Sequence, residues 1–153
     1  SDVCSSDLCP AQELLLVGHS CGSFVALMLA AELRRRPAAA DLAARLTLLT
    51  LGSNIPHLTL LPAATAFRAD LVQLLEPPRL PWLDWSSNDD WLCFAGVNPF
   101  AVVDPAAEAD YPSRRQLPLA EQRGLRGFWG RFGHQFELHF DYWHWLPLEV
   151  RRR

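Results

Sequence analysis

Apolar residues recur along this chain in a pattern that predicts strands alternating with helices. Runs of strand length that are mostly apolar lie at residues 14–17 and 45–51, the second containing one arginine and two threonines, and a weaker run lies at 80–85. Residues 23–35 and 65–75 instead carry apolar side chains at helical spacing. Because continuous apolar strands are typical of a parallel sheet covered on both faces, the pattern predicts an α/β fold that begins with a strand–helix–strand unit.

Prolines and polar stretches mark the boundaries of these elements. Pro37 follows the first predicted helix, and Pro77 and Pro78 follow the second. The remaining segments are predicted as a loop or short helical turn at 38–44, an irregular apolar stretch at 91–103, a polar surface loop at 104–122, and an aromatic-rich segment at 128–145 that ends in a helix.

The first predicted strand and helix are joined by the pentapeptide Gly18-His19-Ser20-Cys21-Gly22. The pattern G-x-S-x-G between a strand and a helix is typical of a nucleophile elbow, a tight turn that exposes the serine hydroxyl to a base. We expect Gly18 and Gly22 to be required because a Cβ there would collide with the turn, and the N–H of Cys21 to face a developing oxyanion. The alternative is an ordinary strand-to-helix turn without chemistry.

A membrane span over residues 14–31 is a competing interpretation of the same segment. His19, Ser20 and two glycines interrupt it, so its clean apolar run is far shorter than the roughly 18 residues that a span needs. The pattern therefore favours a buried strand followed by a helix.

Composition narrows the class of protein. Half of the 153 residues are hydrophobic and a fifth are charged, which indicates one globular domain or a large part of one. The net charge of −3 provides no basic patch for nucleic acid, and all 14 basic residues are arginine, which favours a GC-rich genome. The four cysteines form no C-x-x-C pair and the histidines at 134, 139 and 144 do not share a helix face, so no metal or other cofactor is predicted.

Residues 1–8 differ in composition from the rest of the chain. One choice of codons for them resembles the end of a common sequencing adapter, and we hypothesise that they are translated adapter at a contig edge. The alternative is a short disordered tail. Residues 9–153 are then the part to which fold arguments apply, and genomic sequence with a start codon upstream of Cys9 would contradict the hypothesis.

A serine nucleophile needs a base, and the base needs an acid that holds its tautomer. The segment 82–91, Trp-Leu-Asp-Trp-Ser-Ser-Asn-Asp-Asp-Trp, resembles the tryptophan and aspartate segment of the class 3 (fungal-type) lipase-like hydrolases. The resemblance places the catalytic acid at Asp90 and Asp84 at the Asn/Asp position before it. We expect Asp84 to order the loop by hydrogen bonding. The alternatives are Asp89 as the acid, or a solvated turn at 88–90 without a catalytic role.

Three histidines compete for the role of base. His139 has a tyrosine three residues later, and this His-x-x-Tyr spacing resembles the segment around the catalytic histidine of the same lipase-like proteins. His134 follows a glycine and His144 lies between two tryptophans, so both stay open as alternatives, as does a purely packing role for all three. His19, inside the elbow, is expected to have a structural role.

The resemblance covers residues 14 to about 94 and implies the α/β-hydrolase superfamily. In that superfamily the elbow strand is central and lies in mid-chain, so we expect residues 9–153 to be the C-terminal part of one such domain. We expect the N-terminal strands and the loop with the second oxyanion donor to be missing. Alone, the chain is predicted to aggregate or fold partly and to show no measurable esterase turnover.

Motif and resemblance together predict a serine hydrolase that cleaves a small-molecule or lipid carboxylic ester through an acyl-enzyme on Ser20. The alternatives are a non-catalytic binding protein of the same fold, or a thioesterase or peptidase. No nucleic-acid partner is expected, and a cytoplasmic or membrane-associated location is favoured over secretion. Most of the tryptophans and phenylalanines are expected in the core, and some in an apolar acyl pocket.

Overall fold

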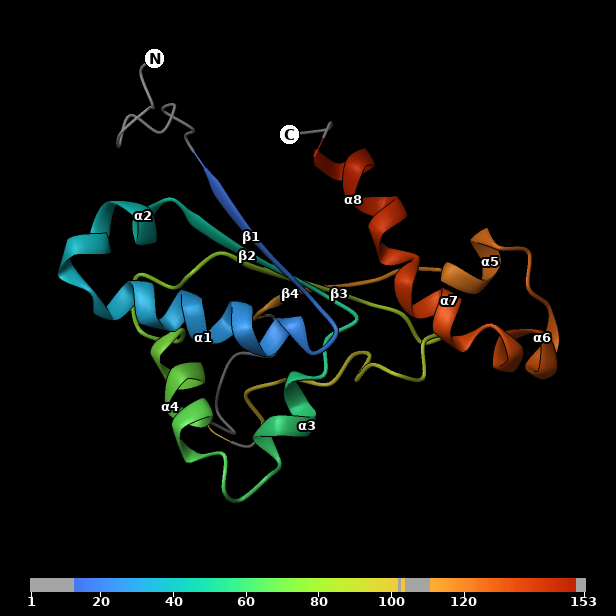
Figure 1. The fold of residues 1–153 in the computed structure, drawn as a ribbon, viewed down its shortest axis with the longest axis horizontal. Helices are drawn as coiled ribbons and strands as arrows, with labels where there is room; N and C mark the ends of the chain where they lie inside the picture. Colours follow the sequence, from blue (N-terminus) through green and yellow to red (C-terminus); the bar gives the residue numbers. More distant parts are fainter. Residues whose placement is uncertain (1–12, 102, 104–110, 151–153) are drawn as a thin grey trace, which may run out of the picture.

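A computed structural model describes residues 13–101, 103 and 111–150 of the chain. Its centre is a sheet of four parallel strands that lie in sequence order: β1 (Leu14–His19), β2 (Leu46–Leu51), β3 (Trp82–Ser86) and β4 (Ser113–Gln116). Helices are interleaved with these strands (Figure 1). The predicted α/β class with a parallel sheet is therefore confirmed.

The helices differ greatly in length. The longest described helix, α1 (Gly22–Arg35), connects β1 to β2 through a 3₁₀ turn, η1 (Pro37–Ala39). The others are α2 (Ala40–Ala44), α3 (Ile55–Thr59), α4 (Thr65–Gln73), α5 (Leu119–Gln122), α6 (Gly127–Gly133), α7 (Gln135–Phe140) and α8 (Tyr142–Val150).

The predicted surface loop at 104–122 is wrong where the structure describes it, because β4 and α5 lie inside it. The strand β4 reads Ser-Arg-Arg-Gln and borders the sheet, and most of its side chains are exposed. An edge strand with a polar sequence gives no apolar pattern, so periodicity does not detect it. The short helix α3 was also not predicted, and the aromatic-rich segment forms three helices.

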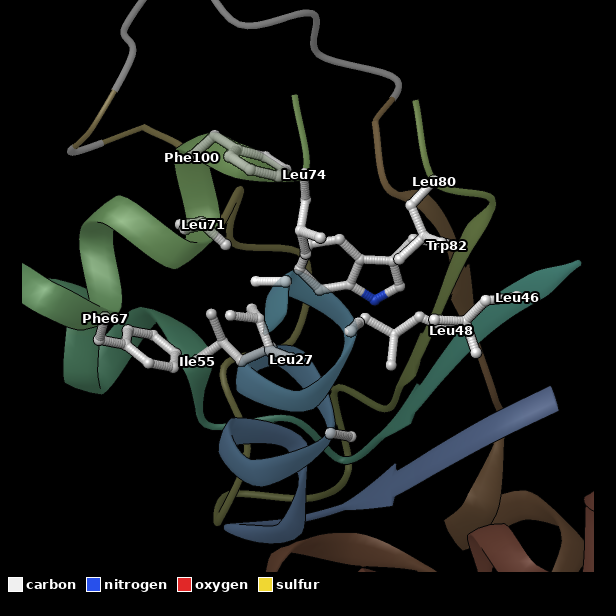
Figure 2. Packing of buried hydrophobic residues seen from close by; sticks show 13 residues of the cluster. Leu27, Leu46, Leu48, Ile55, Phe67, Leu71, Leu74, Leu80, Trp82 and Phe100 are labelled. Atoms are coloured by element: carbon white, nitrogen blue, oxygen red, sulfur yellow. The ribbon is translucent and has the colours of Figure 1, made fainter. Parts of the chain in front are cut away.

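One face of the sheet packs on α1 and α4. The strand β2 is buried throughout, and its side chains alternate, so Leu46 and Leu48 point to this face. Figure 2 shows them beside the indole of Trp82, with side chains of α1 and α4 closing the layer. The buried residues of this first core include Leu27, Ile55, Phe67, Leu71, Leu74, Leu80 and Phe100.

The opposite face packs on the last third of the chain. Leu49 and Leu51 of β2 and Trp85 of β3 contact a second buried cluster there. Its other buried members are Leu117, Leu119, Ala120, Leu138 and Tyr142. Thus β2 and β3 lie between two layers, and α7 and α8 are held against the face that α1 and α4 leave free (Figure 1).

The strand β1 borders the sheet in the described part of the chain. It pairs with β2 along its whole length, and Leu14 and Leu15 near its start are 41 % and 37 % exposed. The outward side of α1 also carries exposed apolar residues, Val25, Met28 and Leu29. Among the described helices, none is both long enough and apolar enough to cross a membrane.

Candidate active site

The turn after β1 holds Ser20 in a conformation that side chains rarely adopt. Its φ is +53°, the only positive φ among the described non-glycine residues. Two main-chain hydrogen bonds fix the turn: the Ser20 N–H donates to the Leu51 carbonyl (2.9 Å), and the Ser20 carbonyl accepts from the Ser23 N–H (3.0 Å). Such left-handed backbone is strained outside glycine and persists where surrounding structure enforces it.

The two glycines of the motif differ in what they allow. A Cβ on Gly18 would lie 2.7 Å from the Ser23 Cα and 2.8 Å from the Ala26 Cβ, so only glycine fits between strand and helix. A Cβ on Gly22 would meet nothing within 4 Å. The prediction that a Cβ at Gly22 collides with the turn is therefore wrong, because Gly22 begins α1 with its open side outward. Cys21, the helix N-cap, is also exposed.

The carboxyl ends of β1, β2 and β3 meet at one edge of the sheet, as parallel strands require. Ser20 follows β1, Gly52 follows β2, and the loop with Asp90 follows β3. His139 comes from α7, which packs on the same end of the sheet through the second core. The fold thus collects the predicted serine, acid and base in one region.

The Asp90 side chain is fully buried, and both of its oxygens are engaged. Oδ1 accepts a hydrogen bond from the Leu92 N–H (2.9 Å), and Oδ2 lies 2.7 Å from Nδ1 of His139. The turn before it is closed by the Asp90 N–H, which donates to the Ser87 carbonyl (3.1 Å). Asp90 therefore points inward from the turn, whereas Asn88 in the same turn is exposed.

His139 is the histidine that the structure places beside Asp90. With the proton on Nδ1, the ring donates to Asp90 and keeps the lone pair of Nε2 free to accept another proton. The rival His134 faces Glu137 at 3.7 Å, and the side chain of His144 is 71 % exposed beside Asp141. Of these three histidines, only His139 is itself buried together with its carboxyl partner, because the ring of His144 is exposed although Asp141 is buried.

Asp89 points away from this pair. Its Oδ2 accepts from the Ala120 N–H (3.2 Å), and its Oδ1 lies 3.6 Å from an Arg131 nitrogen. Together with Leu125 and Arg126, these residues line a pocket between α5 and α6 that none of Ser20, Asp90 and His139 borders. The contacts of Asp89 are thus those of a residue that fixes loops.

Tyr142 supplies a second donor to Oδ2 of Asp90. Its hydroxyl donates to Asp90 Oδ2 (3.1 Å) and lies 3.6 Å from the Cys93 sulfur. Burial raises the pKa of both groups, to about 11 for Cys93, so both keep their protons near neutral pH. Because Oδ2 accepts from His139 and Tyr142 together, the carboxyl is held in one orientation.

Gly52 lies against the same three side chains. Its φ is +53°, and a Cβ would lie 2.8 Å from the Tyr142 ring and 3.3 Å from both Asp90 Oδ2 and His139 Cε1. The sequence indicated only a turn here, at the end of the second strand. Its role in leaving room for the buried pair depends on contacts with residues far along the chain.

Gln135, one turn before His139 on α7, forms hydrogen bonds to the loop that carries Asp90. Its Oε1 accepts from the Trp91 N–H (2.9 Å), and its Nε2 donates to the Asp89 carbonyl (3.2 Å). These are the two neighbours of Asp90 in the chain. Sequence reasoning missed this residue, since a glutamine on an exposed helix carries no recognisable pattern.

Asp84 lies inside the sheet and bonds to a strand, not to the loop as predicted. It is paired in register with Thr50, whose hydroxyl donates to Asp84 Oδ1 (2.5 Å) and accepts from the Trp82 indole N–H (3.0 Å). Burial raises the pKa of Asp84 to about 6. Asp84 faces a neighbouring strand because β3 extends to Ser86, which places Asp84 in mid-strand.

The aromatic residues divide between core and surface. Among the described tryptophans and phenylalanines, only Phe67, Trp82, Trp85 and Phe100 are buried, so the prediction that most of them lie in the core is wrong. The helices after Leu125 instead expose most of theirs, namely Phe128, Trp129, Phe132, Phe136, Phe140 and Trp143. Two of these lie beside the site, because the His19 ring contacts Phe140 and Trp143.

In the described part of the chain, no group of three or more histidine, cysteine, aspartate or glutamate side chains is placed to hold a metal ion. Comparisons with protein-family models, with curated proteins and with solved structures gave no significant match to this chain.

Proposed function

We propose that this chain carries the catalytic residues of a serine hydrolase that cleaves a carboxylic ester. The observation that carries the proposal is the buried hydrogen bond between Asp90 and His139, 2.7 Å long, at the sheet edge where the strained turn presents Ser20. A base oriented by a buried acid, next to a hydroxyl on a forced turn, is the arrangement that nucleophilic catalysis by serine requires.

The order of these residues along the fold supports the same proposal. Ser20 follows the first described strand, Asp90 the third and His139 the fourth. Serine, acid and histidine occur in this chain order in α/β-hydrolases, with the serine between a strand and a helix. We infer that the sheet is part of such a domain, with β1 as the strand that leads into the serine turn.

In the proposed reaction, His139 Nε2 takes the proton of Ser20 Oγ while that oxygen attacks the ester carbonyl carbon. The main-chain N–H of Cys21 stabilises the tetrahedral oxyanion. His139 then gives the proton to the departing alcohol, which leaves the acyl group on Ser20. Water gives a proton to the same histidine as it attacks the acyl carbon, and the acid leaves as Ser20 Oγ regains its proton, while Asp90 orients the ring throughout and stabilises the imidazolium each time it forms.

Labelling with a fluorophosphonate tests the proposal. The complete gene product that contains this chain should bind the probe covalently, and the Ser20→Ala variant should not. Ser113→Ala, on the exposed side of β4, is the matched control and should label like the wild type. Equal labelling of wild type and Ser20→Ala would refute the proposal, as would failure of the folded wild type to react.

A further inference from the structure

His19 links the elbow to the segment that carries His139. It is the last residue of β1, and its ring Nε2 lies 2.6 Å from the main-chain carbonyl oxygen of His139. Because a carbonyl oxygen only accepts, the ring proton is on Nε2. The neighbour of the candidate nucleophile therefore donates a hydrogen bond to the residue that supplies the candidate base.

The carbonyl of His139 is a group that needs such a donor. The helix α7 ends at Phe140, so this carbonyl belongs to its last turn. The last carbonyls of a helix have no intrahelical partner and must be satisfied by other groups. His19 thus caps α7 at the residue whose side chain bonds to Asp90.

Ring packing holds His19 in place for this bond. Its ring centroid lies 4.8 Å from that of His139, 5.2 Å from Phe140 and 5.6 Å from Trp143. Burial lowers the pKa of His19, so the ring is neutral at pH 7 and keeps a single proton. That proton is the one on Nε2 which the His139 carbonyl accepts.

We propose that His19 is a positioning residue whose ring N–H fixes the end of α7 against the elbow and thereby sets the place of the His139 imidazole relative to Ser20. The inference rests on the proposed function. Asp90 holds His139 by its ring and His19 holds it by its main chain, so the two contacts together fix both the orientation and the position of the base.

Substitutions at His19 separate the hydrogen bond that its ring N–H donates from the packing of its ring. His19→Leu removes the donor, whereas in His19→Gln the side-chain amide reaches the place of Nε2 and donates. His57→Leu is the control, since His57 is exposed and its ring contacts Phe94, away from His139. Thermal unfolding checks that each variant is folded.

Nuclear magnetic resonance of the histidine rings tests whether the hydrogen bond from His19 to the His139 carbonyl positions His139, without relying on turnover. In the complete gene product, the far-downfield Nδ1–H proton of His139, bonded to Asp90, should shift or broaden in His19→Leu. It should return towards its wild-type position in His19→Gln and stay unchanged in His57→Leu. An unchanged resonance in a folded His19→Leu variant would overturn the inference.

Kinetics on a p-nitrophenyl ester give the second readout. We expect His19→Leu to lower kcat about tenfold or more with KM within about twofold, because a misplaced base slows chemistry and not binding. His19→Gln should restore most of kcat. A wild-type kcat in folded His19→Leu would contradict the proposal. If the wild type neither labels nor turns over, the proposed function fails, while the resonance still decides whether His19 holds His139.

If His19→Leu does not fold, His19→Asn replaces it. Asparagine also carries an amide, but it is too short to reach the place of Nε2. We then expect the glutamine variant to exceed the asparagine variant in kcat and to preserve the His139 resonance better. Equal kcat and equal His139 resonances in the two variants would overturn the inference that His19 positions His139.

Discussion

The two faces of the sheet are held together by different kinds of contact. On the face that α1 and α4 cover, fully buried aliphatic and aromatic side chains such as Leu27 and Phe100 form a mainly apolar layer. The buried hydrogen bond between Thr50 and Asp84 also belongs to this layer. On the other face, the short helices α5 to α8 add buried polar contacts, among them those of Asp90 with His139 and Tyr142. The first arrangement maximises burial, and the second fixes the direction of individual groups.

A further polar contact belongs to the second face. Arg123, just after α5, pairs with the buried Asp141 between α7 and α8. Short helices contribute little stability of their own, so such contacts determine where they lie. The difference between the faces predicts that mutations on one face change the free energy of unfolding, whereas mutations on the other change catalysis in a protein that stays folded.

The largest effect, on kcat/KM, is expected from substitutions of Asp90 and His139, which lie on the second face. His139→Ala and Asp90→Asn should each lower kcat/KM by roughly 10³-fold or more, because the base is lost or its tautomer is no longer held. Steady-state kinetics of folded variants measure this. His144→Ala, at an exposed side chain, should keep near-wild-type activity. Near-full activity of His139→Ala together with an inactive His134→Ala would transfer the role of base to His134.

The next largest effect, on the free energy of unfolding, is expected from a substitution in the first core. Leu27 is fully buried under the sheet, so Leu27→Ala should lower the free energy of unfolding by about 2–5 kcal/mol through lost burial and a residual cavity. Denaturant unfolding measures it, and kcat of the folded fraction should not change. Leu29→Ala, on the same helix at a 46 % exposed position, is the control and should have a small effect.

A pH-dependent effect is expected from Asp84, a polar residue among the core side chains of the first face. Its pKa rises from 3.8 to about 6 on folding, so the folded state binds the proton more tightly. The resulting stabilisation is complete below pH 3.8 and is lost as the pH rises through 6. From pH 7 to pH 4 the wild type should gain up to about 3 kcal/mol relative to Asp84→Asn. Parallel stability curves of the two proteins would contradict this.

The smallest effect compares two tyrosines, one on each face. Tyr111 donates to the Leu80 carbonyl (2.8 Å) beside the first core, and Tyr142 donates to Asp90 at the site. Each change to phenylalanine should lower stability by about 1 kcal/mol. Only Tyr142→Phe should also lower kcat, by about fivefold, because the acid loses a donor. A matching fall of kcat in Tyr111→Phe would remove the distinction between the faces.

The parts of the fold that the sequence predicted are those whose burial leaves a periodic pattern. The strand β2 is buried on both faces and therefore reads as leucines interrupted only by two threonines, and α1 shows helical spacing. The strand β4 was missed because its edge position allows a polar sequence. The short helices after it were not separated, since they are ordered by tertiary contacts and not by local preference.

In the candidate site, too, only the features with a local sequence pattern could be predicted. The position of Ser20 on a forced turn follows from a local motif, and its φ of +53° agrees with that expectation. The His-x-x-Tyr spacing favoured His139 only through a resemblance and left His134 and His144 open, because packing of α7 determines which histidine meets Asp90. The contributions of Gly52 and Gln135 are equally invisible in the sequence, since each depends on partners dozens of residues away.

Mass spectrometry of a quenched reaction tests the central claim most directly. The complete gene product is mixed with a p-nitrophenyl ester, stopped in acid within the first turnovers, digested, and fragmented to single-residue resolution. The account predicts that the acyl group is on Ser20, and that it accumulates more slowly in His139→Ala. An acyl group on the neighbouring Cys21, or turnover without any acylated Ser20, would contradict it.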